Sequence, residues 1–223
     1  MTISENSKKD IIKHLNYDLQ RVKVVYPGLS PNFKLLAKTK IEPVLKKYRL
    51  NPDFLLFVGT LEPRKNLIRL LKAIDLLEEV TLVIVGQEGW RAKEIKKQAA
   101  RCRHHLRFLG YVPDQDLPAL YNAAKLFVYP SLYEGFGLPV IEAMACGCPV
   151  VTAKTSSFPE ICGQAAILVD PDNINSLARG IKEILSRPAL SKTLKEKGLK
   201  KAKEFSWQKC AQETLRVYEE ITQ

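Results

Sequence analysis

Glu134 and Glu142 are residues whose type and spacing point to chemistry. Seven residues separate them within a stretch, residues 129–152, that runs from an apolar segment through a glycine-containing loop. A carboxylate is badly placed to bind a phosphate, but it accepts hydrogen bonds from hydroxyl groups. We therefore expect both glutamates to face the hydroxyl groups of a sugar or a ribose. As isolated residues, they would more simply be solvated carboxylates on a loop and a helix.

The loop between these glutamates has the features of an anion site. Pro139 suits the first turn of a helix, where its missing N–H needs no partner, and Gly147 followed by Pro149 stops that helix. A loop that feeds a helix start leaves unpaired N–H groups and the positive end of the helix dipole facing a ligand. Phosphates bind at such positions. The residues expected to contribute are Gly135, Phe136, Gly137 and Leu138.

A pair of cations follows another apolar run. Arg64 and Lys65 lie in the loop after residues 54–58, which read as a buried strand. The fold would bring this loop to the same sheet edge as Glu134. Arginine can bind two oxygens at once and lysine acts as a point charge, so the pair predicts a diphosphate site. A solvated surface loop is the alternative.

Two Asp-x-Asp sequences, Asp114-Gln-Asp116 and Asp170-Pro-Asp172, could in principle hold a metal ion. Each stands where a helix is expected to begin, so caps and turns explain them better. Because two cations and a helix dipole are already available to neutralise phosphate, the sequence predicts no metal requirement.

The five cysteines are odd in number and contain no C-x-x-C pair. They favour neither a disulfide scaffold nor structural zinc, and a reducing cytoplasm is expected. His104 and His105 follow Cys102 closely, but adjacent side chains in a strand point to opposite faces. The N-terminus lacks the apolar core of a signal peptide. No run approaches the roughly 18 to 20 apolar residues that cross a bilayer.

The net charge of +11 is unevenly distributed. Residues 1–52 carry eleven Lys and Arg against four Asp and Glu, residues 53–170 thirteen of each, and residues 171–223 eleven against seven. The segment with the candidate site is therefore neutral, and no basic run is interleaved with aromatics, so nucleic acid is not an expected partner. Basic flanks indicate a solvated face, or contact with a partner chain or with anionic lipid at the inner face of the membrane.

Strands and helices alternate through the middle of the sequence. Apolar runs predict strands at residues 54–58, 80–85, 106–109, 126–129, 149–153 and 166–169. Helical spacing predicts a helix that begins after Asn66, which is expected as its cap. Further helices are predicted at residues 91–102, 114–124 and 173–186, and two lysine-rich helices from Ser191 onward. This alternation predicts an α/β fold with a Rossmann-like, doubly wound parallel sheet that binds ligands at the C-terminal ends of its strands. We expect this domain at residues 51–188, followed by C-terminal helices at 189–223.

The first fifty residues do not read as the start of a domain. A helix is expected from Ser4, a candidate cap, to Leu15, followed by a strand at 23–26 and a turn at 27–31. A self-contained N-terminal hairpin is one interpretation of this segment.

Residues 134–151, E-G-F-G-L-P-V-I-E-A-M-A-C-G-C-P-V-V, resemble the signature of the retaining glycosyltransferases of family 4 over eighteen contiguous positions. That family has the GT-B architecture of two Rossmann-like domains, of which this chain resembles the C-terminal one. The resemblance implies a hexosyltransferase that moves a sugar from a nucleoside diphosphate donor to the hydroxyl of a glycan, lipid or other acceptor, with retention.

The same resemblance implies a role for each candidate residue. Glu134 would contact the donor sugar near the reacting carbon, and Glu142 would bind the ribose hydroxyls of the nucleotide. Lys65 matches the lysine that holds the diphosphate as it leaves. Arg64 is a substitute, because the family more often has an arginine where this chain has Thr60.

The family also binds the nucleotide base with backbone groups after the strand at 106–109. In this sequence those residues are Gly110, Tyr111 and Val112. Tyr111 could stack on the base, or it could be an edge aromatic that covers the core.

Thr2 to Ile11 and Tyr26 to Leu29 are similar to the segments that lead from the first family domain to the second. The resemblance implies that residues 1–50 are a remnant of the acceptor-binding domain and a linker. The isolated chain would then bind donor weakly and transfer sugar poorly. The alternative is a non-catalytic nucleotide-sugar-binding module completed by a partner chain.

Two other nucleotide-binding classes are disfavoured. A nicotinamide-dependent enzyme would need G-x-G-x-x-G after a strand, and a phosphate-loop ATPase would need G-K-[ST]. Neither pattern occurs in this sequence.

Overall fold

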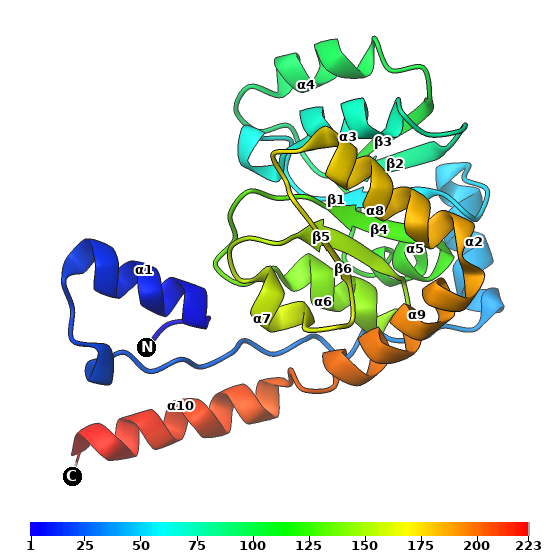
Figure 1. Cartoon of the computed structure of the whole chain (residues 1–223). Helices are drawn as coiled ribbons and strands as arrows, with labels where there is room; N and C mark the ends of the chain where they lie inside the picture. The colour runs from blue at the N-terminus through cyan, green and yellow to red at the C-terminus, as the bar shows by residue number, and fades with distance from the viewer. Residues whose placement is uncertain (223) are drawn as a thin grey trace.

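Six parallel strands form one sheet in the order β3-β2-β1-β4-β5-β6 (Figure 1). The computed structural model describes residues 1–222. The strands are β1 (Leu55–Val58), β2 (Thr81–Val85), β3 (His105–Gly110), β4 (Leu126–Tyr129), β5 (Val150–Ala153) and β6 (Ile167–Val169). The predicted doubly wound parallel sheet is confirmed, because the chain builds β1 to β3 outward in one direction and β4 to β6 in the other. The strand order reverses between β1 and β4.

Helices cover both faces of this sheet. On one face α3 packs against α4 and α8, and on the other α6 packs against α5, α7 and α9 (Figure 1). The helices are α1 (Glu5–Leu15), α2 (Lys38–Tyr48), α3 (Leu67–Ile74), α4 (Ala92–Ala99), α5 (Leu117–Ala123), α6 (Leu138–Ala145), α7 (Phe158–Cys162), α8 (Ile174–Ser186), α9 (Pro188–Ala202) and α10 (Trp207–Thr222), with short 3-10 turns at Leu19–Arg21 and Pro63–Lys65. Among the described residues, no helix is both long enough and apolar enough to cross a membrane.

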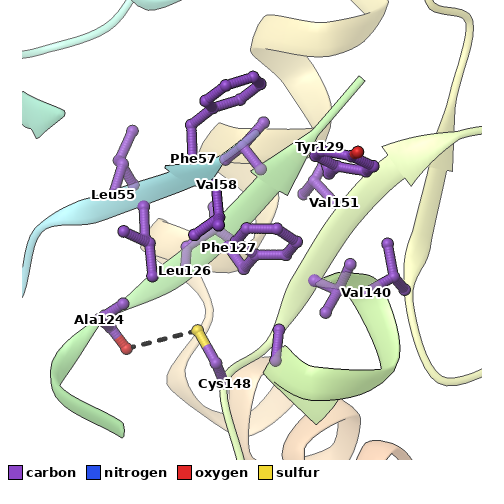
Figure 2. Close-up of a cluster of buried hydrophobic side chains, with 14 of the residues drawn as sticks. Leu55, Phe57, Val58, Ala124, Leu126, Phe127, Tyr129, Val140, Cys148 and Val151 are labelled. Carbon is purple, nitrogen blue, oxygen red and sulfur yellow. Dashed lines mark hydrogen bonds between the residues drawn. The ribbon is translucent and has the colours of Figure 1, made fainter. Parts of the chain in front are cut away.

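The middle of the sheet is buried on both faces. Every residue of β1 and β4 is buried, as their uninterrupted apolar runs predict (Figure 2). The ring of Tyr129 at the end of β4 stacks on Phe127, with centroids 5.6 Å apart, and lies 5.9 Å from Phe57. This packing fixes where the phenol oxygen of Tyr129 emerges at the C-terminal edge of the sheet.

The N-terminal region differs from its prediction. The strand expected at residues 23–26 is wrong, because only a single bridge joins Val24 to Thr2. The chain turns into α1 soon after Thr2, since Ser4 already caps that helix by accepting a hydrogen bond from the Ser7 N–H. The cap at Ser4 is confirmed. Helix α2 and the five-residue α7 had no counterpart in the prediction.

A carboxylate from the main domain holds the start of α1. Glu160 in α7 accepts hydrogen bonds from the N–H groups of Glu5 and Asn6 at 3.0 and 3.1 Å, and from the Tyr26 hydroxyl at 3.1 Å. These contacts satisfy N–H groups that a helix start leaves unpaired. They dock α1 beside the sheet edge where β4 ends, although most of α1 lies apart from the sheet layers in Figure 1.

Candidate functional site

A cleft of about 460 Å³ opens at the C-terminal edge of the sheet, where β1 and β4 end. Gly59 and Thr60 line it after β1, Tyr129 lines it at the end of β4, and residues 134–139 line it before and at the start of α6. Ile3 and Pro27 from the N-terminal segment, together with Lys65, complete the lining. Because the strand order reverses between β1 and β4, this is the position at which open α/β sheets bind their ligands.

A larger cavity, of about 630 Å³, lies at the opposite edge of the sheet. It is lined by the first residues of β1 and β2, by Lys125 before β4, and by Lys182 in α8. Cavity size therefore favours the N-terminal edge. We assign the site to the smaller cleft because Glu134 and Lys65 line it next to the start of a helix, and Arg64 pairs with Glu134 there.

The carboxylate of Glu134 is the centre of the cleft. Its Oε1 accepts hydrogen bonds from Lys65 Nζ at 2.6 Å, Ser131 Oγ at 2.7 Å and Tyr129 Oη at 3.0 Å. Its Oε2 lies 2.8 Å from Arg64 Nη1. The structure thus brings together Glu134, Arg64 and Lys65, which the sequence predicted to share one sheet edge.

Both cations already have acidic partners. The guanidinium of Arg64 also pairs with Glu62 at 2.6 Å and donates to the Tyr133 carbonyl at 2.7 Å. Two glutamates therefore balance Arg64 and Lys65, and the four side chains carry no net formal charge. The sequence predicted the two cations but not that Glu62 and Glu134 balance their charge. Glu62 lies three residues before Lys65, and nothing in the sequence indicates that it pairs with Arg64.

Glu134 is ionised in this environment. Burial alone would raise its pKa, but hydrogen bonds from Lys65, Ser131 and Arg64 favour the charged form and hold the pKa below its ordinary value. Tyr129 shows the opposite effect: burial and the adjacent Glu134 carboxylate raise the pKa of its phenol far above the usual range. Tyr129 is therefore a neutral hydroxyl that accepts from Lys65 at 2.7 Å and donates to Glu134.

Helix α6 begins at this cleft, as predicted. Gly137 has φ +105° at its N-cap, and a Cβ there would lie 2.9 Å from Phe158 Cε1, so the position needs glycine. Phe136 is buried against Tyr26 and Phe205, so only its backbone can face a ligand. Leu138 is partly exposed.

Glu142 lies further along α6. It is not one of the described residues that line the cleft. Burial raises its pKa to about 7, against the effect of a hydrogen bond that Tyr121 Oη donates to its Oε2 at 3.0 Å. The charge of Asp114 raises the pKa further. Asp114 follows Val112 by two residues, so its charge couples Glu142 electrostatically to the end of the segment expected to bind the base.

That segment lies where β3 ends. Gly110 has φ +66° and its carbonyl accepts from the Gly86 N–H at 2.8 Å. Tyr111 is 63% exposed, so its ring is free to stack, whereas the side chain of Val112 belongs to the core. This segment, residues 110–112, shares the C-terminal edge of the sheet with Glu134. It does not belong to the described residues that line the cleft.

Asp116 and Asn66 stand at the N-cap positions of α5 and α3, as predicted, but neither side chain makes a cap hydrogen bond. Asp116 makes no cap hydrogen bond and instead accepts from Lys47 Nζ at 2.6 Å and Tyr48 Oη at 2.8 Å, which joins α2 to α5. Asn66 has φ +62° and donates its side-chain amide to the carbonyls of Pro130 and Pro171. In both cases a distant partner competes successfully with the local N–H groups.

The remaining candidate ligands are dispersed. Asp170 forms the predicted turn, because its side chain accepts a hydrogen bond from the Asp172 N–H at 3.0 Å. It also forms an ion pair with Lys154. His104 is buried and His105 exposed, so they point to opposite sides. In the part of the chain that the structure describes, no group of three or more His, Cys, Asp or Glu is placed to hold a metal ion.

The raised pKa of Glu142 predicts a pH-dependent stability. Because its folded pKa of about 7 lies above the ordinary value of 4.5, the folded state binds the proton more tightly than the unfolded state does. Its contribution to the free energy of unfolding is complete below pH 4.5 and is lost as the pH rises through 7, by about 3 kcal/mol in total. Denaturant unfolding at pH 5 and pH 8 should show this loss in the native protein. Glu142→Gln should lack it, and an equal loss in both proteins would contradict the assignment.

Comparison with known proteins identifies related sequences. The family model described as glycosyl transferases group 1 matches residues 40–201. The O-antigen chain mannosyltransferase B of Escherichia coli is 38% identical over 226 residues, which cover 98% of this chain and 59% of that protein. This chain therefore spans about three fifths of the length of that relative.

Solved structures share the fold. Sucrose-phosphate synthase from Thermosynechococcus elongatus superimposes with a TM-score of 0.85 at 25% identity, over 99% of this chain and 57% of its own. A glycosyltransferase from Rickettsia africae superimposes with a TM-score of 0.89 at 21% identity, over 99% of this chain and 62% of its own. The arrangement of sheet and helices is therefore that of known glycosyltransferase structures.

Proposed function

Because this chain belongs to the glycosyl transferases group 1 family, we propose that it is the donor-binding half of a retaining glycosyltransferase. The reaction moves a sugar from a nucleoside diphosphate donor to an acceptor hydroxyl. The observation that carries this proposal is the meeting of Lys65, Arg64 and Glu134 beside the start of α6, at the point where the strand order reverses.

The diphosphate of the donor would lie between the cations and the helix start. Lys65 and Arg64 supply positive charge, and the backbone N–H groups of residues 135–138 supply donors and the positive end of a helix dipole. Departure of the diphosphate builds negative charge, which these fixed groups offset. In this proposal the two cations turn from their glutamate partners toward the diphosphate, and the proposed reaction uses no metal ion.

The two glutamates would bind hydroxyl groups. Glu134 is ionised and reaches the cleft, so it can accept a hydrogen bond from a hydroxyl of the donor sugar. Glu142 would accept from the ribose hydroxyls, and the backbone of residues 110–112 would contact the base. The effect of Asp114 on the pKa of Glu142 supports the nearness that these two roles require.

We propose mannose as the donor sugar. The O-antigen chain mannosyltransferase B of Escherichia coli is 38% identical over nearly all of this chain, and its name gives the sugar that it transfers. A growing glycan is the proposed acceptor, in keeping with the name of that relative.

Isothermal calorimetry with a panel of ligands tests the proposal. The panel contains GDP-mannose, UDP-glucose, GDP, UDP and free mannose. We expect GDP or UDP to bind, the matching nucleotide sugar to bind more tightly, and free mannose not to bind. Lys182→Ala, in the larger cavity at the other sheet edge, is the control and should leave binding unchanged. Binding that depends on Lys182, or no binding of any nucleotide, would contradict the proposal.

A further inference from the structure

Ser156 has an unusual backbone conformation beside the candidate site. It lies in the turn between β5 and α7 with φ +59°, a value that residues other than glycine rarely adopt. Such conformations persist only where surrounding interactions hold them, and they cluster at functional sites. The contacts of this side chain therefore need an explanation.

The hydroxyl of Ser156 holds both polar backbone groups of one residue. It accepts a hydrogen bond from the Glu134 N–H at 2.9 Å and donates one to the Glu134 carbonyl at 2.6 Å. A hydroxyl has one proton and two lone pairs, so it can make both bonds at once. The neighbouring Ser157 lies closer to the Phe136 carbonyl, at 2.6 Å, than to that of Glu134, at 3.1 Å. Ser156 is thus the side chain that binds the Glu134 backbone on both sides.

The loop that carries Glu134 needs such a constraint. Gly135 follows it immediately and Gly137 comes two residues later, and glycines leave a backbone free to adopt many conformations. With its N–H and carbonyl fixed, the backbone of Glu134 sets the direction in which the side chain leaves. That direction leads to the four donors around the carboxylate, Lys65 and Arg64 among them.

We propose that Ser156 is a positioning residue for Glu134. By holding the peptide groups on either side of the Glu134 Cα, it fixes the carboxylate in the cleft where the donor sugar binds. This inference rests on the proposed function, in which Glu134 binds a hydroxyl of the sugar. Ser156 itself is not among the described residues that line the cleft.

The test measures how much the sugar adds to binding. For each variant, calorimetry gives the ratio of affinities for GDP-mannose over GDP and for UDP-glucose over UDP. For whichever nucleotide binds, Ser156→Ala and Ser156→Gly should each lower the affinity ratio by about tenfold. Glu134→Gln should lower it by the same factor, because in all three variants a hydrogen bond to a charged group is lost or misplaced. Thr155→Ala, at the adjacent residue, is the control and should keep the native ratio.

Thermal unfolding of the two Ser156 variants separates positioning from stability. Glycine adopts φ +59° without strain, so Ser156→Gly should melt at a higher temperature than Ser156→Ala. If Ser156 has only a structural role, the variant with the lower melting temperature should also have the lower affinity ratio. If Ser156 positions Glu134, the affinity ratio should fall equally in Ser156→Ala and Ser156→Gly.

The outcomes also separate this inference from the proposed function. If Glu134→Gln lowers the ratio and Ser156→Gly keeps it, the positioning role is wrong and the proposed function stands. If Glu134→Gln itself keeps the native ratio, then Glu134 does not bind the sugar, and the proposed function fails.

Discussion

Replacing Lys65 with alanine should weaken the binding of a nucleoside diphosphate by about 100-fold, because truncating one partner of a buried, hydrogen-bonded charge pair is costly. The Lys65 side chain is only 11% exposed, and its ammonium contacts both Glu134 and Tyr129. The variant would remove a cation from the proposed diphosphate position and leave Arg64 as the cation that pairs with Glu134. Calorimetry with GDP and UDP at fixed pH and salt measures the loss.

Two further variants make this result specific. Lys72→Ala removes an exposed lysine from α3 and should bind as the native protein does. Lys65→Arg keeps the charge but cannot reproduce a compact ammonium between two oxygens, so an intermediate affinity is expected. Native affinity in Lys65→Ala would place the diphosphate elsewhere.

Raising the pH from 6 to 8 should strengthen the binding of a nucleotide sugar about tenfold, because a group with a pKa near 7 changes from mostly protonated to mostly ionised over this range. Glu142 is that group, with a pKa of about 7. In the proposed ribose site, its carboxylate can accept hydrogen bonds from hydroxyl groups at both oxygens only when it has lost its proton. The expected direction is therefore tighter binding at higher pH.

The ligand and the control matter for this measurement. A nucleotide sugar is preferred to a free nucleoside diphosphate, whose terminal phosphate itself titrates near pH 6. Glu142→Gln has no proton to lose, so its affinity should be low and the same at both pH values. A tenfold change that persists in Glu142→Gln would assign the titration to another group.

The central strands of this fold could be predicted because they are buried on both faces. The runs at residues 54–58 and 126–129 are continuously apolar, and the structure has β1 and β4 within one residue of them. Helix α2 escaped prediction because it has Pro43 in its middle and buries only Leu45. The five residues of α7 are too few to display helical periodicity.

The part of the candidate site that could be predicted from the sequence is the part whose position the fold topology alone determines. Arg64 and Glu134 follow β1 and β4, and the C-terminal ends of neighbouring parallel strands must meet. The roles of Tyr129 and Ser156 depend on contacts between residues whose positions only the folded structure fixes. Ser131 and Tyr129 carry no signal beyond their nearness to Glu134. The same reason explains Asp116, whose partners Lys47 and Tyr48 come from the unpredicted α2.

The balance of two acids and two bases in the cleft has a consequence for ligand choice. A free inorganic phosphate would have to displace Glu134, which is tethered beside Lys65, and would offer that carboxylate nothing in return. A sugar nucleotide brings hydroxyl groups that can replace the hydrogen bonds Glu134 gives up. Attraction to charge alone therefore does not fill such a cleft, and common anions of the cell, which bring no sugar hydroxyl groups, would compete poorly for it.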